Sequence, residues 1–215
     1  MASTPLEPST ADDSRPALTV RDELRALTNQ RLVAAAQLVF ERDGYARATV
    51  GNIAAEANVN RATFYLHFAD KAQVMLAVMR ANLADTPAYW REVDAALIDG
   101  GREALRAALG GTLDWYQRHR RTLRPVREAL ATDLNLAEQT ENNFAAHADH
   151  MARYLARVPA AERERAHLRL RLLLIQLDQL AFRLVVQRRH DIDRDDMLDE
   201  ITDIWRLTLP AIDHA

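Results

Sequence analysis

The chain has 215 residues, a formal net charge of −3 and 48% hydrophobic residues, so it is long enough to bury a substantial core. Its 6 Gly and 7 Pro disfavour a turn-rich β fold, and the absence of Cys excludes disulfides, thiolate metal sites and thiol catalysis. The serines all lie within the first 14 residues, which excludes a Ser-His-Asp hydrolase, and the glycines match neither common nucleotide-binding loop.

Residues 1–19 are rich in Ser, Thr, Pro, Ala and Asp and show no sustained period, so we expect a disordered arm. No apolar run in the chain is long enough to span a bilayer, and the start lacks a basic stretch followed by an apolar one. These features predict a cytoplasmic protein with no membrane partner.

The stretch 20–43 has the apolar spacing of an amphipathic helix, and Gly44 is placed to end it. Its apolar residues are expected on one buried side: Leu24, Leu27, Leu32, Ala35, Ala36, Val39 and Phe40.

Three short elements follow in close succession. Thr49 is placed to cap a helix that runs to Ala57, and Asn58-Val59-Asn60 has the residues of a tight turn. Asn60 then caps a short helix over 61–68, and Asp70 caps a fourth helix. Two helices of about two turns joined by three residues predict a helix-turn-helix unit.

The second helix of this unit leaves mostly polar groups facing outward. Asn60, Arg61, Thr63, Tyr65 and His67 suit base edges and phosphates in a major groove. The alternative interpretation is a generic solvated helix pair.

Residues 30–76 resemble the DNA-binding domain of the tetracycline-repressor (TetR) family. The turn glycine that is usual in that family is replaced by Asn58 and the usual serine cap by Asn60, two residues that suit those backbone positions. The resemblance is carried by Phe40, Gly44, Tyr45, Thr49, Val50, Ile53, Ala54, Thr63, Tyr65, His67, Phe68 and Lys71.

The resemblance implies an all-α protein with a three-helix DNA-binding domain over 20–70 and a helical regulatory and dimerisation domain over 71–215. It implies phosphate contacts from Thr49, Tyr65, His67 and Lys71. It implies base contacts from Asn60, Arg61, Ala62 and Thr63. Arg47, just before the second helix, is a weaker candidate for a phosphate contact.

The remainder of the chain has helical patterns interrupted by Gly and Pro. We expect breaks near Pro87, Gly100-Gly101, Gly110-Gly111, Pro125, Pro159 and 191–195, although Gly110-Gly111 equally suits a close helix approach. The segment 164–188 carries two apolar stripes, and the second predicts a partner chain in a twofold homodimer. The predicted interface is Leu168, Leu172, Ile175, Val186, Leu198, Ile201 and Trp205. The alternative is a helix that is central to its own bundle.

The family's regulatory bundle implies a pocket for a small effector, and aromatic and polar groups within the helices are the candidates. These are Tyr89, Trp90, Trp115, Tyr116, Asn143, Phe144, His147, Gln176, Gln179, Phe182 and Arg183. Each aromatic equally suits plain core, and Gln176, Gln179 and Arg183 equally suit the rim of a dimer. Tyr89 and Trp90, near the far end of the helix that begins at Asp70, are expected to transmit the effector signal.

His147 and His150 lack the further ligands that a metal needs, so no metal site and no cofactor are predicted. The resemblance implies a one-component regulator, as a repressor, that binds a palindromic double-stranded operator and is released by a small apolar or aromatic effector. An activator of the same fold is the alternative, and a helical small-molecule-binding protein or enzyme is a weaker one, since no nucleophile or cofactor loop is present.

Overall fold

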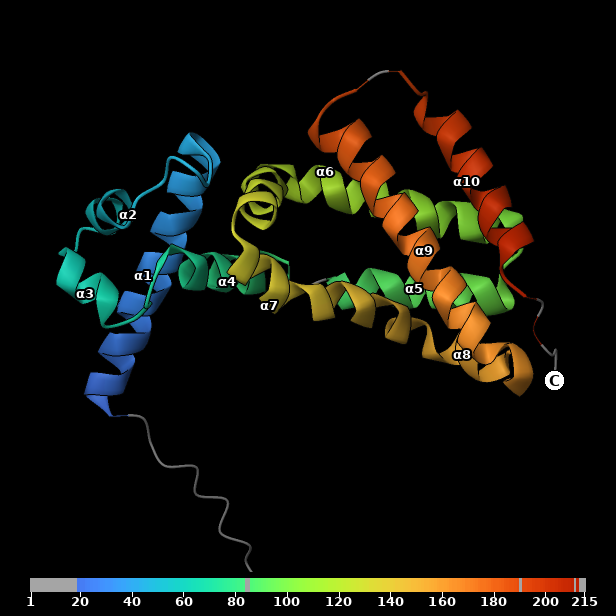
Figure 1. Ribbon diagram of the computed structural model, residues 1–215, viewed down its shortest axis with the longest axis horizontal. Helices are drawn as coiled ribbons and strands as arrows, with labels where there is room; N and C mark the ends of the chain where they lie inside the picture. Colours follow the sequence, from blue (N-terminus) through green and yellow to red (C-terminus); the bar gives the residue numbers. More distant parts are fainter. Residues whose placement is uncertain (1–18, 84–85, 190, 211, 213–215) are drawn as a thin grey trace, which may run out of the picture.

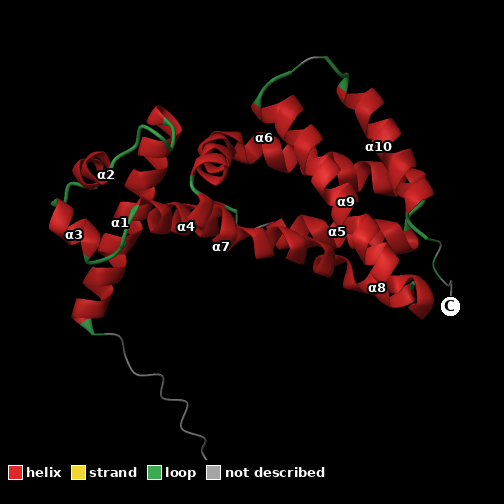
Figure 2. Ribbon diagram, viewed as in Figure 1, coloured by secondary structure: helices red, strands yellow, loops and turns green. Residues whose placement is uncertain are grey.

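The computed structural model describes residues 19–83, 86–189, 191–210 and 212, without the side chains of 86–88 and 141–146. The described residues form helices joined by loops, and none of them lies in a β-strand (Figure 2). No helix among them is long and apolar enough to cross a membrane. The arm predicted over 1–19 lies outside these residues, apart from Thr19.

The first four helices form one unit, drawn at the left of Figure 1. They are α1 (Val20–Asp43), α2 (Val50–Glu56), α3 (Arg61–Tyr65) and α4 (Lys71–Asn82). Their core is sealed by side chains from later in the chain, because Val126, Ala129 and Leu136 belong to the same buried cluster. This first unit therefore does not end sharply at residue 70, and later helices complete its core.

The remaining helices form a bundle, drawn at the right of Figure 1. They are α5 (Thr86–Asp99), α6 (Arg102–Thr132), α7 (Leu134–Ala145), α8 (Ala152–Arg157), α9 (Arg163–Ala181) and α10 (Arg194–Thr208). Short irregular helices join them: the 3₁₀ helices η1 (Ala146–Met151) and η2 (Ala160–Glu162) and the π-helix η3 (Phe182–Val186).

Helix α1 begins and ends at the predicted residues. Thr19 and Asp22 cap its start reciprocally, and Gly44 ends it with a φ of 81°, a conformation that glycine adopts without strain. The prediction that Leu24 and Leu27 lie in the core was wrong, since they are 60% and 54% exposed. The first turns of α1 project beyond the helices that pack on it, so none of the described residues covers the apolar side of these turns.

Helix α6 continues through both breaks predicted within it. The helix does not break at Gly110, and a Cβ placed there would stand 3.6 Å from Leu198 Cδ1 of α10, an ordinary contact distance that does not require glycine. Pro125 is buried inside the helix rather than at its end. A proline in a helix interior removes one backbone hydrogen bond and bends the axis. Figure 1 shows the last turns of α6 running in a different direction from the rest.

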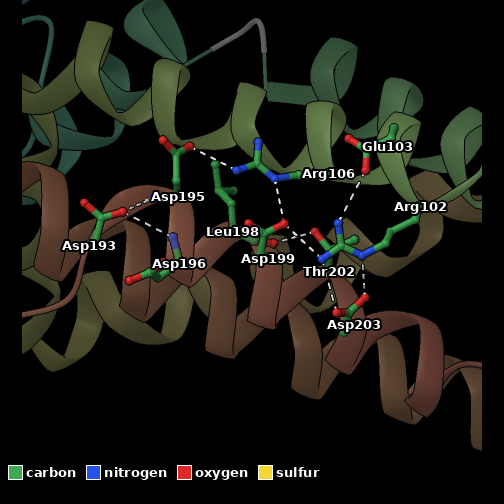
Figure 3. Close-up of polar contacts among 10 residues, drawn as sticks. All are labelled: Arg102, Glu103, Arg106, Asp193, Asp195, Asp196, Leu198, Asp199, Thr202 and Asp203. Atoms are coloured by element: carbon green, nitrogen blue, oxygen red, sulfur yellow. Dashed lines mark hydrogen bonds and ion pairs between the residues drawn. The ribbon is translucent and has the colours of Figure 1, made fainter.

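Helix α10 is fastened to α6 by ion pairs along one edge (Figure 3). Arg102 donates to Asp199 at 2.9 Å and to Asp203 at 2.8 Å, while Arg106 donates to Asp199 and Asp195 at 3.0 Å each. Shared partners lower the entropy cost of each pair, so such a network fixes register better than isolated surface pairs do. The register turns Leu198, Ile201 and Trp205 inward, where at most 2% of each is exposed.

Candidate nucleic-acid interface

Both helices of the helix-turn-helix unit, α2 and α3, are capped by the residues that the sequence predicted. Thr49 accepts a hydrogen bond from the backbone N–H of Asn52 at 3.1 Å, and Asn60 accepts one from Thr63 at 2.7 Å. Asn58 has a φ of 52°, the left-handed conformation that asparagine tolerates better than most residues. These caps satisfy amides that the helices leave open and set the angle between α2 and α3.

Helix α3 buries one side and exposes the side predicted to read DNA. Phe64 is fully buried among Ile53, Ala54 and Phe68. The opposite side presents Arg61, Ala62 and Tyr65 to solvent, with Thr63 and His67 half-buried at its margin. Guanidinium, phenol, hydroxyl and imidazole groups therefore share one exposed surface, which has the chemistry for both phosphate and base-edge contacts.

Lys71, predicted to hold a phosphate, is engaged within the protein. Its ammonium donates to the carbonyl oxygens of Tyr45 at 2.7 Å and Ala48 at 3.2 Å and lies 4.1 Å from the centre of the Tyr45 ring. Partial burial lowers the pKa of Lys71 below its ordinary value. The structure thus places this lysine as a brace for the loop between α1 and α2, and its phosphate contact stays a prediction.

The projecting start of α1 brings Arg25 near His67, beside the exposed face of α3. Sequence reasoning did not assign this arginine to the site. Burial, and after it the charge of Arg25, lowers the pKa of His67, so the imidazole is neutral at pH 7. Arg47 is exposed and uses one guanidinium N–H on the carbonyl oxygen of Asp43 at 2.8 Å. Arg25 and Arg47 thus add positive charge around the exposed surface of α3, whereas Lys71 donates its hydrogen bonds within the protein.

The DNA-binding unit is joined to the bundle by a carboxylate that sequence reasoning missed. Glu128 of α6 accepts hydrogen bonds from the backbone N–H groups of Tyr45 at 2.9 Å and Ala46 at 3.0 Å. The Tyr45 hydroxyl donates to Asp133 at 2.7 Å. A movement of the last turns of α6 therefore acts directly on the loop that precedes α2.

The interior of the bundle contains a chain of aromatic rings that includes several predicted effector residues. Tyr89 lies 4.2 Å from Trp90 and 5.8 Å from Trp115, and Trp90 lies 5.8 Å from His147, centre to centre. Tyr89 and Trp90 were expected near the far end of the helix that begins at Asp70. That placement was wrong, because α4 ends at Asn82 and both rings lie on α5. The side chains of Asn143 and Phe144 lie outside the described part of the chain.

A charged pair that the sequence did not reveal lies beside these rings. The Asp178 carboxylate accepts hydrogen bonds from the Tyr116 hydroxyl and from the Arg127 guanidinium. The two charged side chains are only 14% and 27% exposed, and the guanidinium lies 4.7 Å from the centre of the Phe182 ring. Burial and the neighbouring Asp178 raise the pKa of Tyr116.

Three predicted effector residues of α9 and η3 do not face this interior. The inward side of α9 is Leu170, Leu173, Leu174, Leu177 and Ala181. Gln176, Gln179 and Arg183 are exposed, and Arg183 donates to Asp191 at 2.5 Å. The polar residue that does reach the interior is Asp178, which the helical period placed next to Leu177 without showing which side it faces.

His147 makes the stability of the bundle depend on pH. Burial lowers its pKa from 6.5 to about 4, so the unfolded chain takes up a proton before the folded protein does. Its contribution is full above pH 6.5 and is lost as the pH falls toward 4. We expect the free energy of unfolding to drop by about 1–2 kcal/mol between pH 7 and about pH 5 through this group.

Urea unfolding of the wild-type protein and of His147→Gln at both pH values tests this expectation. The difference in stability between the two proteins is expected to shrink at the lower pH. An unchanged difference would show that the imidazole titrates normally, and His167→Gln, at a histidine that pairs with Asp149 in a more exposed place, serves as the control.

One outer side of α9 carries apolar residues that none of the described residues covers. Leu168, Leu172 and Ile175 are 55%, 59% and 45% exposed, as an interface stripe requires, whereas Val186 is half-buried against the core. The structure places Leu198, Ile201 and Trp205 in the core of their own chain, so α10 offers no interface through them. The exposed apolar residues of α10 are Ile204 at 38% and Leu207 at 87%.

A helix-turn-helix unit with an exposed polar helix, joined to a helical bundle with an aromatic interior, is the architecture of a transcription regulator. Residues 32–78 match the family model for bacterial regulatory proteins of the tetR family. This match assigns the helix-turn-helix unit to the DNA-binding domain of that family.

Individual relatives agree with that assignment. The chain is 29% identical to the Transposon Tn10 TetC protein of Escherichia coli over 48% of this chain and 51% of that protein. It is 28% identical to the HTH-type transcriptional activator FasR of Mycolicibacterium smegmatis over 69% of this chain and 66% of that protein. The alignments thus span about half of the length of TetC and just under two thirds of the length of FasR.

Among solved structures, the complex of SmeT with triclosan matches with a TM-score of 0.54 and 25% identity over 82% of this chain and 90% of that one. SmeT is the repressor of a multidrug efflux pump of Stenotrophomonas maltophilia.

Proposed function

We propose that the protein is a ligand-responsive transcription regulator that binds a palindromic DNA operator as a homodimer and leaves it when a small apolar or aromatic effector binds. The observation that carries DNA binding is the exposed surface of α3, where Arg61, Thr63 and Tyr65 stand on a helix that Asn60 caps and Phe64 anchors. Such a regulator works where DNA is, so its proposed location is the cytoplasm.

The homodimer rests on the uncovered stripe of α9. Leu168, Leu172 and Ile175 repeat at helical spacing, and Ile204 and Leu207 extend the apolar surface onto α10. A contiguous exposed apolar surface of this kind is typical of a protein interface. A twofold arrangement sets two copies of α3 about 34 Å apart, so that both enter the major groove on one side of the duplex.

The effector site rests on the aromatic interior of the bundle. Trp90 is 5% exposed, and its indole N–H finds no acceptor among the described residues. Buried polar groups normally have partners, so an effector with an aromatic body and a hydrogen-bond acceptor suits this place. SmeT has been solved with triclosan, a finding that belongs to SmeT and is consistent with this proposal.

Release from DNA requires that effector binding in the interior affect the DNA-binding unit, and α6 contacts both. Arg127 contacts Asp178 in the interior, and the next residue, Glu128, holds the loop before α2. To change a regulator from mostly bound to mostly free, the effector must favour the released arrangement by about 10⁴-fold. An effector that displaces Arg127 or Asp178 thus acts on contacts one residue away from the DNA-binding unit.

Selection from a random-sequence DNA library tests DNA binding without knowledge of the operator. We expect an enriched palindrome with half-site centres about 10 base pairs apart, and no enrichment with the Arg61→Ala, Tyr65→Ala double variant. Arg118→Ala, at an exposed arginine in the middle of α6, serves as the matched control. Failure of the wild-type protein to enrich any sequence would refute the proposal.

The regulated promoter then separates repression from activation. We propose repression, because a regulator that leaves DNA when its effector binds blocks transcription by occupancy alone. A reporter gene behind the selected sequence is expected to be silenced by the protein. A rise in reporter output would identify an activator, the class to which FasR belongs.

A further inference from the structure

A second pocket lies on the outside of the bundle, where α6 meets η3 and the loop before α10. It has a volume of about 600 Å³, within the usual range for small-molecule sites. In Figure 1 this loop stands above α6, whereas α2 and α3 form the opposite side of the picture. The pocket shares no residue with the aromatic interior proposed for the effector.

Arginines dominate the polar lining of this pocket. Arg120, Arg188 and Arg189 all line it. Arg189 lies near Asp191 and helps to lower the pKa of that carboxyl, which accepts a hydrogen bond from Arg183. The other two charged groups are engaged elsewhere. Arg194 donates to Asp114 at 2.8 Å, and Asp193 accepts hydrogen bonds from the first amides of α10. The lining therefore has four guanidinium groups and one carboxylate, so positive charge is in excess.

The remaining wall of the pocket is apolar. Leu113 is 2% exposed at its base, Leu184 and Val185 of η3 are half-buried, and Ile192 is 39% exposed at its rim. Guanidinium groups bind carboxylates and phosphates through paired hydrogen bonds, and an adjoining apolar wall binds a hydrocarbon body. The lining thus matches a molecule that is anionic at one end and apolar at the other.

The backbone at this pocket is unusual in two respects. The π-helix η3 interrupts the regular hydrogen bonding of α9, a feature that is frequent at functional sites. Arg188 then adopts a φ of 54°, in the left-handed region where a helix ending of this type usually has glycine. An arginine is strained in this conformation, whereas a glycine is not.

We propose that this pocket binds an amphipathic anion, a small molecule with a carboxylate or phosphate head and an apolar body. The head pairs with Arg120, Arg188 and Arg189, and the body lies on Leu113, Val185 and Ile192. This site is separate from the exposed surface of α3 and from the aromatic interior. Together with the proposed effector site, it gives the protein two small-molecule sites. The inference does not depend on DNA binding.

Isothermal titration with octyl phosphate tests the proposal on the full chain, with inorganic phosphate, octanol and octylammonium as comparison probes. Two variants remove guanidinium groups. Arg120→Gln keeps the length and polarity of the side chain, and Arg188→Gly relieves the left-handed backbone and so protects the fold. Arg118→Gln, at an exposed arginine of the same helix outside the pocket, is the control.

We expect octyl phosphate to bind more tightly than the other three probes, and each pocket variant to weaken it about tenfold, since a charge-assisted pair contributes about 1.4 kcal/mol or more. The double variant is expected to abolish binding and Arg118→Gln to leave it unchanged. Unaltered binding in the double variant, equal binding of octanol, octylammonium or inorganic phosphate, or no binding of octyl phosphate would each overturn the assignment.

Discussion

Replacing Arg127 by methionine is expected to lower the free energy of unfolding by about 3 kcal/mol, the lower end of what breaking a buried ion pair costs. Among the described residues, the substitution leaves the Asp178 carboxylate, 14% exposed, with the Tyr116 hydroxyl as its hydrogen-bond donor. A charge held in such a place without its counter-ion pays the desolvation penalty without compensation. Urea unfolding at one protein concentration measures the loss.

A second substitution separates the ion pair from simple packing. Changing Asp178 to leucine in the Arg127→Met background removes the stranded charge, and most of the lost stability is expected to return. Arg124→Met, at an exposed arginine one turn before, is expected to change stability by less than about 0.5 kcal/mol. A double variant as unstable as Arg127→Met would show that the guanidinium acts through packing on Phe182 instead.

Replacing Leu172 by aspartate is expected to convert a dimer into monomers. Leu172 is 59% exposed in the single chain and stands between Leu168 and Ile175 on the proposed interface. A twofold axis brings two new carboxylates into an apolar contact, and about 4 kcal/mol of lost association energy weakens the dimer about 10³-fold. Sedimentation velocity is expected to show a species of twice 24.3 kDa for the wild-type protein and 24.3 kDa for the variant.

The matched control is Leu134→Asp, at a leucine of α7 that is 79% exposed and lies outside the stripe. It is expected to leave the dimer intact. A wild-type protein that sediments as a monomer would contradict the proposed interface, and so would a Leu172→Asp protein that remains dimeric.

Local features of the fold were predictable because the residues that define them act on their own backbone. Thr49, Asn60 and Asp70 cap the helices that were expected to begin beside them. Asn58 takes the left-handed conformation that its small polar side chain tolerates. Each of these outcomes depends on a few neighbouring atoms, which the sequence supplies.

Features that depend on distant contacts were harder to predict. The helical period placed Leu24 and Leu27 on the same side of α1 as Leu32. It did not show how much of the length of α1 is covered by neighbouring helices. For the same reason, the predicted interface contained Leu198, which is buried, and did not contain Ile204, which is exposed. Two apolar stripes show that a helix has two partners, without showing which stripe meets its own chain.

Polar contacts between residues far apart in the sequence left no pattern in it. Glu128 and Tyr45 are far apart along the chain, and Asp178 resembles any solvated aspartate until Tyr116 and Arg127 are placed beside it. The course of α6 through Pro125 is likewise decided by the packing of Val126 and Ala129 onto the DNA-binding unit. Tertiary packing outweighs the local preference of proline here.

The most direct test of the account is fluorescence anisotropy of the purified protein on its selected DNA sequence over a series of salt concentrations. We predict tight binding that weakens with rising salt through a small number of phosphate contacts and is lost in Arg61→Ala and Tyr65→Ala. A scrambled sequence is predicted to bind far more weakly. Equal affinity for the selected and scrambled sequences, or full binding by both variants, would contradict the conclusion that α3 reads DNA.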